Sequence, residues 1–266
     1  MRKGRWLGVY TGIVILYLFI PISVMILFGF NDPVGRFNFQ WQGFTLEWYR
    51  RLFEIPDLTE SLRNSLLAAA VATVVSTALG SMLALALTRY RFRARGPMNV
   101  FIFLPMATPE IVMGVSLLGL FVTLAVPRGA LTVFIAHILF CLSYVVVTVK
   151  ARTSGLGRDF EEAAQDLGAD PWTTFWTVTF PMIFPGIMAA SLLAAALSID
   201  DYVITSFNAG AFQTFPLWVY GASRIGVPPQ VNVMGTILFM FGVIAVVFSL
   251  LRASRAGAMP ALVKKG

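Results

Sequence analysis

Residues 159–181 read DFEEAAQDLGADPWTTFWTVTFP, and this stretch predicts two short helices joined by a tight turn. Apolar side chains in its first half recur at the i, i+3, i+4 and i+7 spacing of one helical face. These side chains are Phe160, Ala163, Ala164 and Leu167. Gly168 can adopt the left-handed conformation that ends a helix, and Asp170 before Pro171 is a typical start of the next one. The stretch is therefore expected to form a hinged pair of helices in contact with water.

The sequence on both sides of this stretch is too apolar for a soluble protein. Of the 266 residues, 58% are hydrophobic and 12% are charged, and the mean hydropathy is +0.78. A soluble domain carries about 25% charged residues. The apolar residues also form runs of roughly 20 or more, the length that crosses a bilayer as a helix. An all-α membrane protein with six transmembrane helices is predicted, at about residues 7–30, 64–88, 98–125, 130–149, 182–205 and 231–251.

The distribution of basic residues predicts that both termini are cytoplasmic. Fourteen of the twenty Lys and Arg residues fall in the N-terminus, the 89–95 cluster, the 150–180 loop and the C-terminal tail. Only six fall on the opposite side, and Lys and Arg accumulate in cytoplasmic loops. The net charge of +7 is thus explained by topology, without a nucleic-acid partner.

Two further segments have a predicted position. Residues 31–63 hold aromatic side chains among polar ones, which favours a short helix lying in the outer membrane interface. Pro105 and Pro109 interrupt the third span, and such breaks persist in membranes only where protein or a water-filled cavity satisfies the freed backbone groups. The third span is therefore expected to be irregular and to line a path.

Motifs for catalysis are missing from the sequence. It contains no phosphate-cradling G-x-x-x-x-G-K-[ST] run, no H-E-x-x-H helix and no G-x-S-x-G elbow. Cys141 is the only cysteine, so neither a disulfide nor a cysteine metal site can form within the chain. His137 is the only histidine and is predicted to be a packing residue, with a functional role left open. We expect a chain that is not an enzyme and has no cofactor of its own.

The opening stretch resembles the EAA signature of binding-protein-dependent ABC permeases. Glu162-Ala163-Ala164, Gly168 and Val178-Thr179-Phe180-Pro181 have the residue types and the spacing of that signature, with Val178 and Phe180 in place of its usual Ile and Leu. The resemblance covers roughly residues 60–252 and implies a type I ABC importer-like permease. In that family the loop docks on a separate ATPase, which would bind ATP and Mg. The coupling residues expected here are Glu161, Glu162, Ala163, Ala164, Leu167, Gly168, Asp170 and Pro181.

The same resemblance implies a division of the chain into three regions. Residues 1–63 would hold the first span and the outer interfacial segment. Residues 64–252 would be the core permease domain with the cytoplasmic coupling loop at 150–181. Residues 253–266 would be a cytoplasmic tail.

Three carboxylates are predicted within the spans, where charge is costly and marks a pathway. Glu110 lies about 18 Å into the third span, near the midplane, and Asp200 lies about 27 Å into the fifth, with Asp201 beside it. No basic residue has a comparable depth. Acids without basic partners in a pathway suit a cationic solute.

Three stretches resemble the spermidine/putrescine permeases, and among them the smaller of the two permease subunits. They begin at Pro109 (PEIVMGVSLL), Leu197 (LSIDDYVITSF) and Phe215 (FPLWVY). The resemblance implies a second homologous permease, an ATPase dimer, an extracytoplasmic solute-binding protein, and a multi-pass position in the bacterial inner membrane. The residues expected on the substrate path are Glu110, Asp200, Asp201, Tyr202, Trp218 and Tyr220.

Alternatives remain at this stage. The solute could be another small, amine-bearing or cationic compound, and an ion-coupled secondary transporter is the competing class, although it would not need the 150–180 loop. Trp218 and Tyr220 could offer ring faces to an ammonium group or belong to an aromatic belt.

Overall fold

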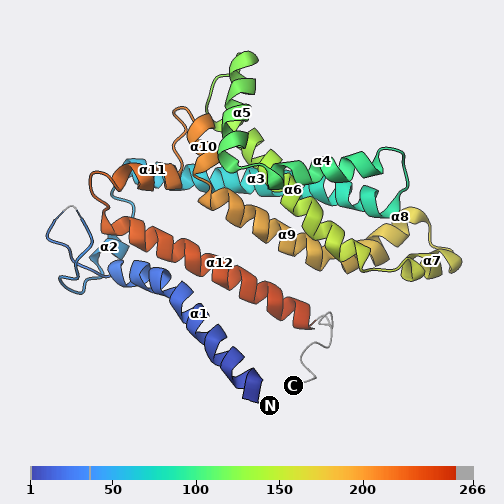
Figure 1. The fold of residues 1–266 in the computed structure, drawn as a ribbon, viewed down its shortest axis with the longest axis horizontal. Helices are drawn as coiled ribbons and strands as arrows, with labels where there is room; N and C mark the ends of the chain where they lie inside the picture. The colour runs from blue at the N-terminus through green and yellow to red at the C-terminus, as the bar shows by residue number, and fades with distance from the viewer. Residues whose placement is uncertain (1, 36, 256–266) are drawn as a thin grey trace. The chain divides into compact units, whose positions relative to one another are not determined.

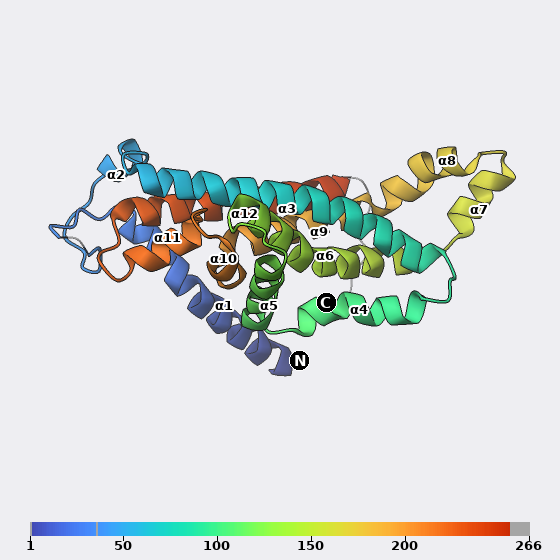
Figure 2. The same ribbon diagram turned by 90° about the horizontal axis from the view of Figure 1, so that it is seen from above.

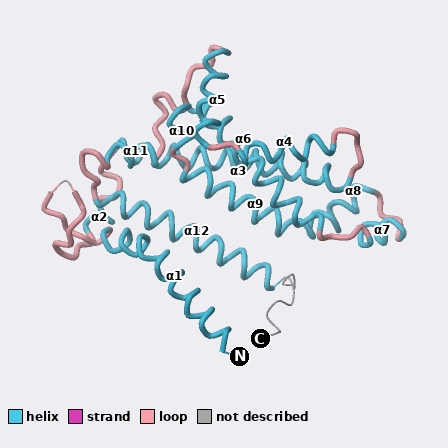
Figure 3. Tube along the Cα trace, viewed as in Figure 1, coloured by secondary structure: helices cyan, strands magenta, loops and turns pink. Residues whose placement is uncertain are grey.

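The computed structural model describes residues 2–35 and 37–255, and these are helical along most of their length, as Figure 3 shows. The described chain forms two compact units. One comprises Met1–Thr59 and Trp218–Ala245, and the other comprises Glu60–Leu217 and Val246–Gly266. The predicted tail at 253–266 lies almost wholly outside the described residues.

The long helices confirm the predicted spans. Five described helices are long and apolar enough to cross a membrane, and a bent pair makes a sixth crossing if it counts as one span. The single helices are α1 (Arg2–Phe28), α3 (Pro56–Arg89), α6 (Ala130–Ser154), α9 (Phe180–Asp200) with the turns before it, and α12 (Pro229–Arg255). The bent pair is α4 (Arg95–Ala107) and α5 (Glu110–Thr123).

The third span is broken where its prolines predicted an irregularity. α4 and α5 meet at an angle of 106°, and Figure 1 and Figure 2 show α5 turned away from the line of α4. The backbone between them is extended, with ψ of 130° at Thr108 and 135° at Pro109. A proline disfavours the helical conformation in the residue before it, so Pro109 ends α4 at this point. Pro105 is accommodated within α4.

In the unit that contains residues 60–217, α6 packs along α9 and supplies much of the buried apolar core, including Val145, Val146 and Phe140. The short helix α10 (Val203–Asn208) packs against α5. Gly114 permits this contact, because a Cβ at that position would lie 2.7 Å from the Phe207 ring. The Asn208 side-chain amide also donates to the Gly114 carbonyl at 3.2 Å. α10 is therefore fixed to α5, the second half of the broken span.

The segment at 31–63 contains a short helix, as predicted, but the second span begins earlier than expected. Among residues 31–35 and 37–55, which the structure describes, only α2 (Glu47–Arg50) is helical. Residues 56–63 belong to α3, so the second span begins eight residues earlier than predicted. The loop folds around the buried Asn31, whose amide donates to Asn38 Oδ1 at 2.6 Å and to the Gln40 carbonyl at 2.7 Å. Hydrogen bonds around one buried asparagine thus hold the loop that precedes α2.

Candidate functional site

The hinged pair of helices is present as predicted. α7 (Asp159–Asp166) is followed by Gly168 at φ +89°, and α8 (Pro171–Thr174) starts directly after Asp170. Asp170 Oδ1 accepts a hydrogen bond from the Thr173 N–H at 3.2 Å. Hydrogen bonding from the Thr173 side chain, and then from its backbone, lowers the pKa of the Asp170 carboxyl below its ordinary value. The cap therefore stays charged at neutral pH and holds the start of α8.

A π-helical turn connects the hinged pair to the fifth span. This segment, η1 (Phe175–Thr179), runs from α8 into α9 without interruption. Its aromatic rings pack edge to face, with Phe175 and Trp176 centroids 5.0 Å apart and Trp176 and Trp172 centroids 5.7 Å apart. π-helical turns are rare and occur often at functional sites. No periodicity of the residues at 175–179 distinguishes this turn from ordinary α-helix.

The apolar stripe of α7 faces away from the rest of the unit. Leu167 is 90% exposed and Phe160 is 63% exposed, which is unusual for large apolar side chains outside a lipid-facing surface. Glu162 and Ala163 are also exposed, whereas Ala164 is half-buried. Pro181, in the first turn of α9, is exposed as well. Most of the predicted coupling residues thus lie on a surface that a partner could cover.

Glu161 has a different environment from its neighbour Glu162. Its Oε1 lies 2.9 Å from Arg89 Nη2 at the end of α3 and accepts a hydrogen bond from the Thr179 hydroxyl at 2.9 Å. The Arg89 and Glu161 side chains are only 16% and 18% exposed, so water screens this pair less than a surface pair. Glu161 therefore ties α7 to α3 and to η1. Neither partner was predicted, because nothing in the local sequence pairs residues 72 positions apart.

The predicted path acids Glu110 and Asp200 lie at helix ends. Glu110 opens α5 and Asp200 closes α9, and both are exposed. They belong to the same compact unit. Tyr144 of α6, in that unit too, packs its ring on Phe140 with centroids 5.3 Å apart.

Asp201 is buried and fully engaged, unlike Asp200. Its carboxylate accepts hydrogen bonds from the backbone N–H groups of Ile204 and Thr205, at 3.3 and 2.8 Å, and from the Thr205 hydroxyl at 2.6 Å. His137 Nε2 lies 3.3 Å from the same carboxylate. The imidazole also contacts Thr205 Oγ1 at 2.8 Å and, through Nδ1, Ser198 Oγ at 2.7 Å. These contacts fix the turn between α9 and α10, which is a structural role for both residues.

The remaining predicted path residues are distributed between the units. Tyr202 is half-buried in the turn after Asp201. Trp218 and Tyr220 lie in α11 (Phe215–Ala222), within the unit formed by Met1–Thr59 and Trp218–Ala245. The Arg224 guanidinium stacks over the Tyr220 ring at 4.9 Å and donates to its hydroxyl at 2.7 Å. The Tyr220 ring thus already has a cation against one face.

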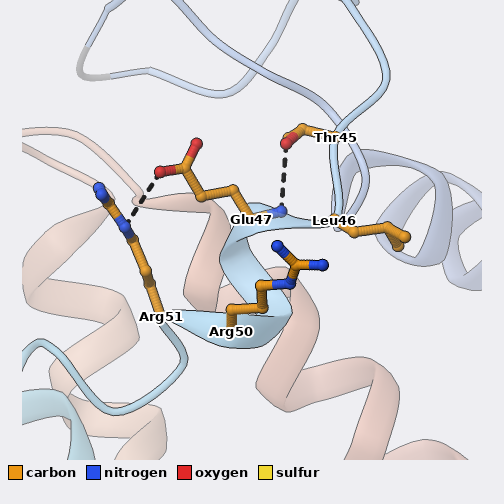
Figure 4. Close-up of a pocket in the computed structure, with 5 residues that line it drawn as sticks. All are labelled: Thr45, Leu46, Glu47, Arg50 and Arg51. Carbon is orange, nitrogen blue, oxygen red and sulfur yellow. Dashed lines mark hydrogen bonds and ion pairs between the residues drawn. The ribbon is translucent and has the colours of Figure 1, made fainter.

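A hollow beside α2, shown in Figure 4, contains none of the predicted path residues. It is lined by Thr45, Leu46, Glu47, Arg50 and Arg51. Glu47 pairs with Arg51 at 3.0 Å, and its backbone N–H bonds to the Thr45 hydroxyl at 3.1 Å. The glutamate that lines the hollow is thus already paired with an arginine. Elsewhere in the described part of the chain, no three His, Cys, Asp or Glu side chains gather as a metal site would require.

Comparison with known proteins identifies the family. The family described as binding-protein-dependent transport system inner membrane component matches residues 76–256, and the chain belongs to it. The protein is therefore a multi-pass permease of an ABC importer in the inner membrane.

Two curated relatives cover nearly the whole chain. The spermidine/putrescine transport system permease protein PotC of Escherichia coli (strain K12) is 38% identical over 254 residues, which make up 95% of this chain and 94% of that protein. The putrescine transport system permease protein PotI of the same strain is 36% identical over 244 residues, or 89% and 86% of the two chains.

Solved structures share the fold at lower identity. A bacterial ABC transporter involved in the import of the acidic polysaccharide alginate contains a chain with a TM-score of 0.64 and 20% identity, covering 95% of each chain. A second crystal structure, of the alginate transporter in complex with an alginate pentasaccharide-bound periplasmic protein, also has a TM-score of 0.64, at 13% identity. At these identities the likeness concerns the fold alone.

Proposed function

We propose that this chain is one of two permease subunits of an ATP-driven polyamine importer, with spermidine and putrescine as its solutes. The names of relatives at 36–38% identity support this solute class. The chain would pair with a homologous permease, receive its solute from an extracytoplasmic binding protein, and couple to a dimeric ATPase that binds ATP and Mg. Both termini and the α7 loop would be cytoplasmic, as the distribution of Lys and Arg favours.

The exposed carboxylates of Glu110 and Asp200, at two helix ends, fit this solute class. A polyamine is a flexible polycation that sheds water when it enters a membrane path, and fixed carboxylates replace part of that hydration. Exposed acids on two helix ends bind each charge weakly, and a path must release what it admits.

Asp201 and the aromatic residues after it have supporting roles in this proposal. By capping the turn after α9, Asp201 and His137 hold Asp200 in place. Tyr202, Trp218 and Tyr220 are proposed to line the outer approach to the path.

The exposed surface of α7 is proposed as the ATPase dock. Phe160 and Leu167 offer apolar contacts, and Glu162 offers a charge that is not used within α7. Glu161, through Arg89 and Thr179, would pass a displacement of α7 to α3 and to the start of the fifth span.

Replacing Glu162 with lysine tests this dock. We expect co-purification of the ATPase to fall at least about ten-fold, equivalent to roughly 1.4 kcal/mol, while the permease pair still inserts. The reversal disfavours α7 itself by about 0.3–1 kcal/mol through the helix dipole, and lost partner contacts add the rest. The yield of ATPase in a pull-down with tagged permease is the measurement.

Asp57→Lys is the matched control. Asp57 is also an exposed acid in the first turn of a helix, but that helix is α3, and Asp57 lies at the end of α3 opposite to Arg89, which contacts α7. It should leave the ATPase yield unchanged. An unchanged yield with Glu162→Lys would show that α7 is not the dock.

A further inference from the structure

A basic hollow lies at the end of α3 that is proposed to be cytoplasmic. It has a volume of about 600 Å³ and is lined by Thr88, Arg89, Tyr90, Arg91, Arg95 and Arg158. The arginines come from the end of α3, the loop after it, the start of α4 and the loop before α7. Four guanidinium groups therefore converge from segments that are up to 69 residues apart in the sequence.

The positive charge of this hollow is only partly neutralised. Among the described residues, the ion pair recorded for these four arginines is that of Arg89 with Glu161. The side chain of Arg158 donates to the Arg89 carbonyl oxygen, which holds it over the hollow without neutralising it. Within the described chain, the Arg91 and Arg95 guanidinium groups form no hydrogen bond or ion pair. Four cations against one carboxylate leave an excess of positive charge.

Arg89 also contains a donor that is not used. Its Nε–H is buried and has no acceptor among the described residues, although its other nitrogens bond to Glu161 and to the Leu156 carbonyl at 3.3 Å. Leaving a buried N–H of a charged group without an acceptor is costly. The hollow thus has the charge that an anionic oxygen ligand requires, and Arg89, which lines it, keeps a donor without an acceptor among the described residues.

The surroundings of the hollow place such a ligand at the membrane surface. Tyr90 and Phe92 alternate with the arginines and are 68% and 39% exposed, as expected of aromatic side chains at a bilayer interface. α4 continues from the hollow with exposed apolar side chains, among them Val100, Phe101 and Leu104, which suit contact with acyl chains. A ligand with a phosphate head and an apolar tail fits both features.

We infer that this hollow binds the phosphate of an anionic phospholipid from the cytoplasmic leaflet. Guanidinium groups match phosphate oxygens geometrically, and basic pockets between membrane helices on this side bind anionic headgroups. Arg158 directly precedes α7, and Arg89 pairs with Glu161 of α7. The bound headgroup would therefore hold the coupling loop in a fixed position at the membrane surface. The inference rests on the cytoplasmic placement in the proposed function, but not on the identity of the solute.

The test measures lipid binding to the assembled transporter, with substitutions only in this chain. After removal of lipid in detergent, phosphatidylglycerol is titrated and bound lipid is counted by native mass spectrometry. Arg91→Gln with Arg95→Gln should weaken the tightest phosphatidylglycerol site about 30-fold, since each arginine near an anionic surface contributes about a five-fold factor. Arg93→Gln is the matched control, because Arg93 belongs to the same cluster but does not line the hollow. It should bind as the wild type does.

Three outcomes would overturn the inference. Equal binding of phosphatidylcholine would show that negative charge is not recognised, and full competition by inorganic phosphate at the same concentration would show that the ligand is free phosphate. Unchanged lipid binding together with a loss of ATPase from the double variant would show that these arginines dock the protein partner. The test measures lipid binding and not transport. Its result therefore does not depend on which solute the transporter moves.

Discussion

Replacing Gly168 with valine should uncouple the transporter, so that ATP hydrolysis continues while uptake falls at least about ten-fold. Gly168 has φ +89°, a region that a β-branched residue adopts only with strain of about 1–3 kcal/mol. The two hydrogen bonds that close the turn run from Gly168 N to the Gln165 carbonyl at 2.9 Å and from Ala169 N to the Ala164 carbonyl at 3.0 Å. Valine would relieve the strain by opening this turn and changing the angle between α7 and α8.

The conformational cause can be separated from a steric one. A Cβ at this position would meet no atom within 4 Å, so the space is open in this chain. Asparagine, which tolerates the left-handed region, should therefore retain most of the uptake. ATPase rate and solute uptake are measured on the same reconstituted preparation. Uptake at the wild-type rate with valine, or an equal loss with asparagine, would contradict this account of the hinge.

Removal of the two exposed acids is expected to have the other large effect. Glu110→Gln and Asp200→Asn keep the size and most of the hydrogen bonding of the side chains but remove the charge that would replace polyamine hydration. Each change should lower the rate of spermidine uptake about ten-fold, equivalent to roughly 1.4 kcal/mol in the barrier. Uptake of labelled spermidine by the assembled complex is the measurement, with ATPase assembly checked in each variant.

Asp32→Asn is the matched control for these changes, because Asp32 is an exposed acid in the outer segment and lies outside the proposed path. It should transport normally. If Glu110→Gln and Asp200→Asn both transport at the wild-type rate, these acids do not form the path, although the membership of the permease family would stand.

The local features of the sequence predicted the hinge and the helices well. The apolar runs gave the spans, Pro109 gave the break, and Gly168 with Asp170-Pro171 gave the turn, because each depends on residues that are close in the chain. The extension of α3 back to Pro56 was missed because residues 56–63 are rich in polar and charged side chains, so hydropathy does not mark them as part of a span.

The features that sequence reasoning missed depend on contacts between distant residues. Arg89 was explained by topology alone, yet it pairs with Glu161 across 72 positions. Asp200 and Asp201 are adjacent acids with the same sequence context, and only the fold separates an exposed carboxylate from one buried against His137.

ATP-driven uptake of labelled spermidine into proteoliposomes tests the central claim most directly. The assembled transporter would be reconstituted with ATP inside, where hydrolysis takes place, and with solute-loaded binding protein outside. The account predicts accumulation that requires ATP, that putrescine competes with, and that persists when ion gradients are collapsed. Absence of ATP-dependent accumulation by a complex that hydrolyses ATP, or uptake driven by an ion gradient without ATP, would contradict it.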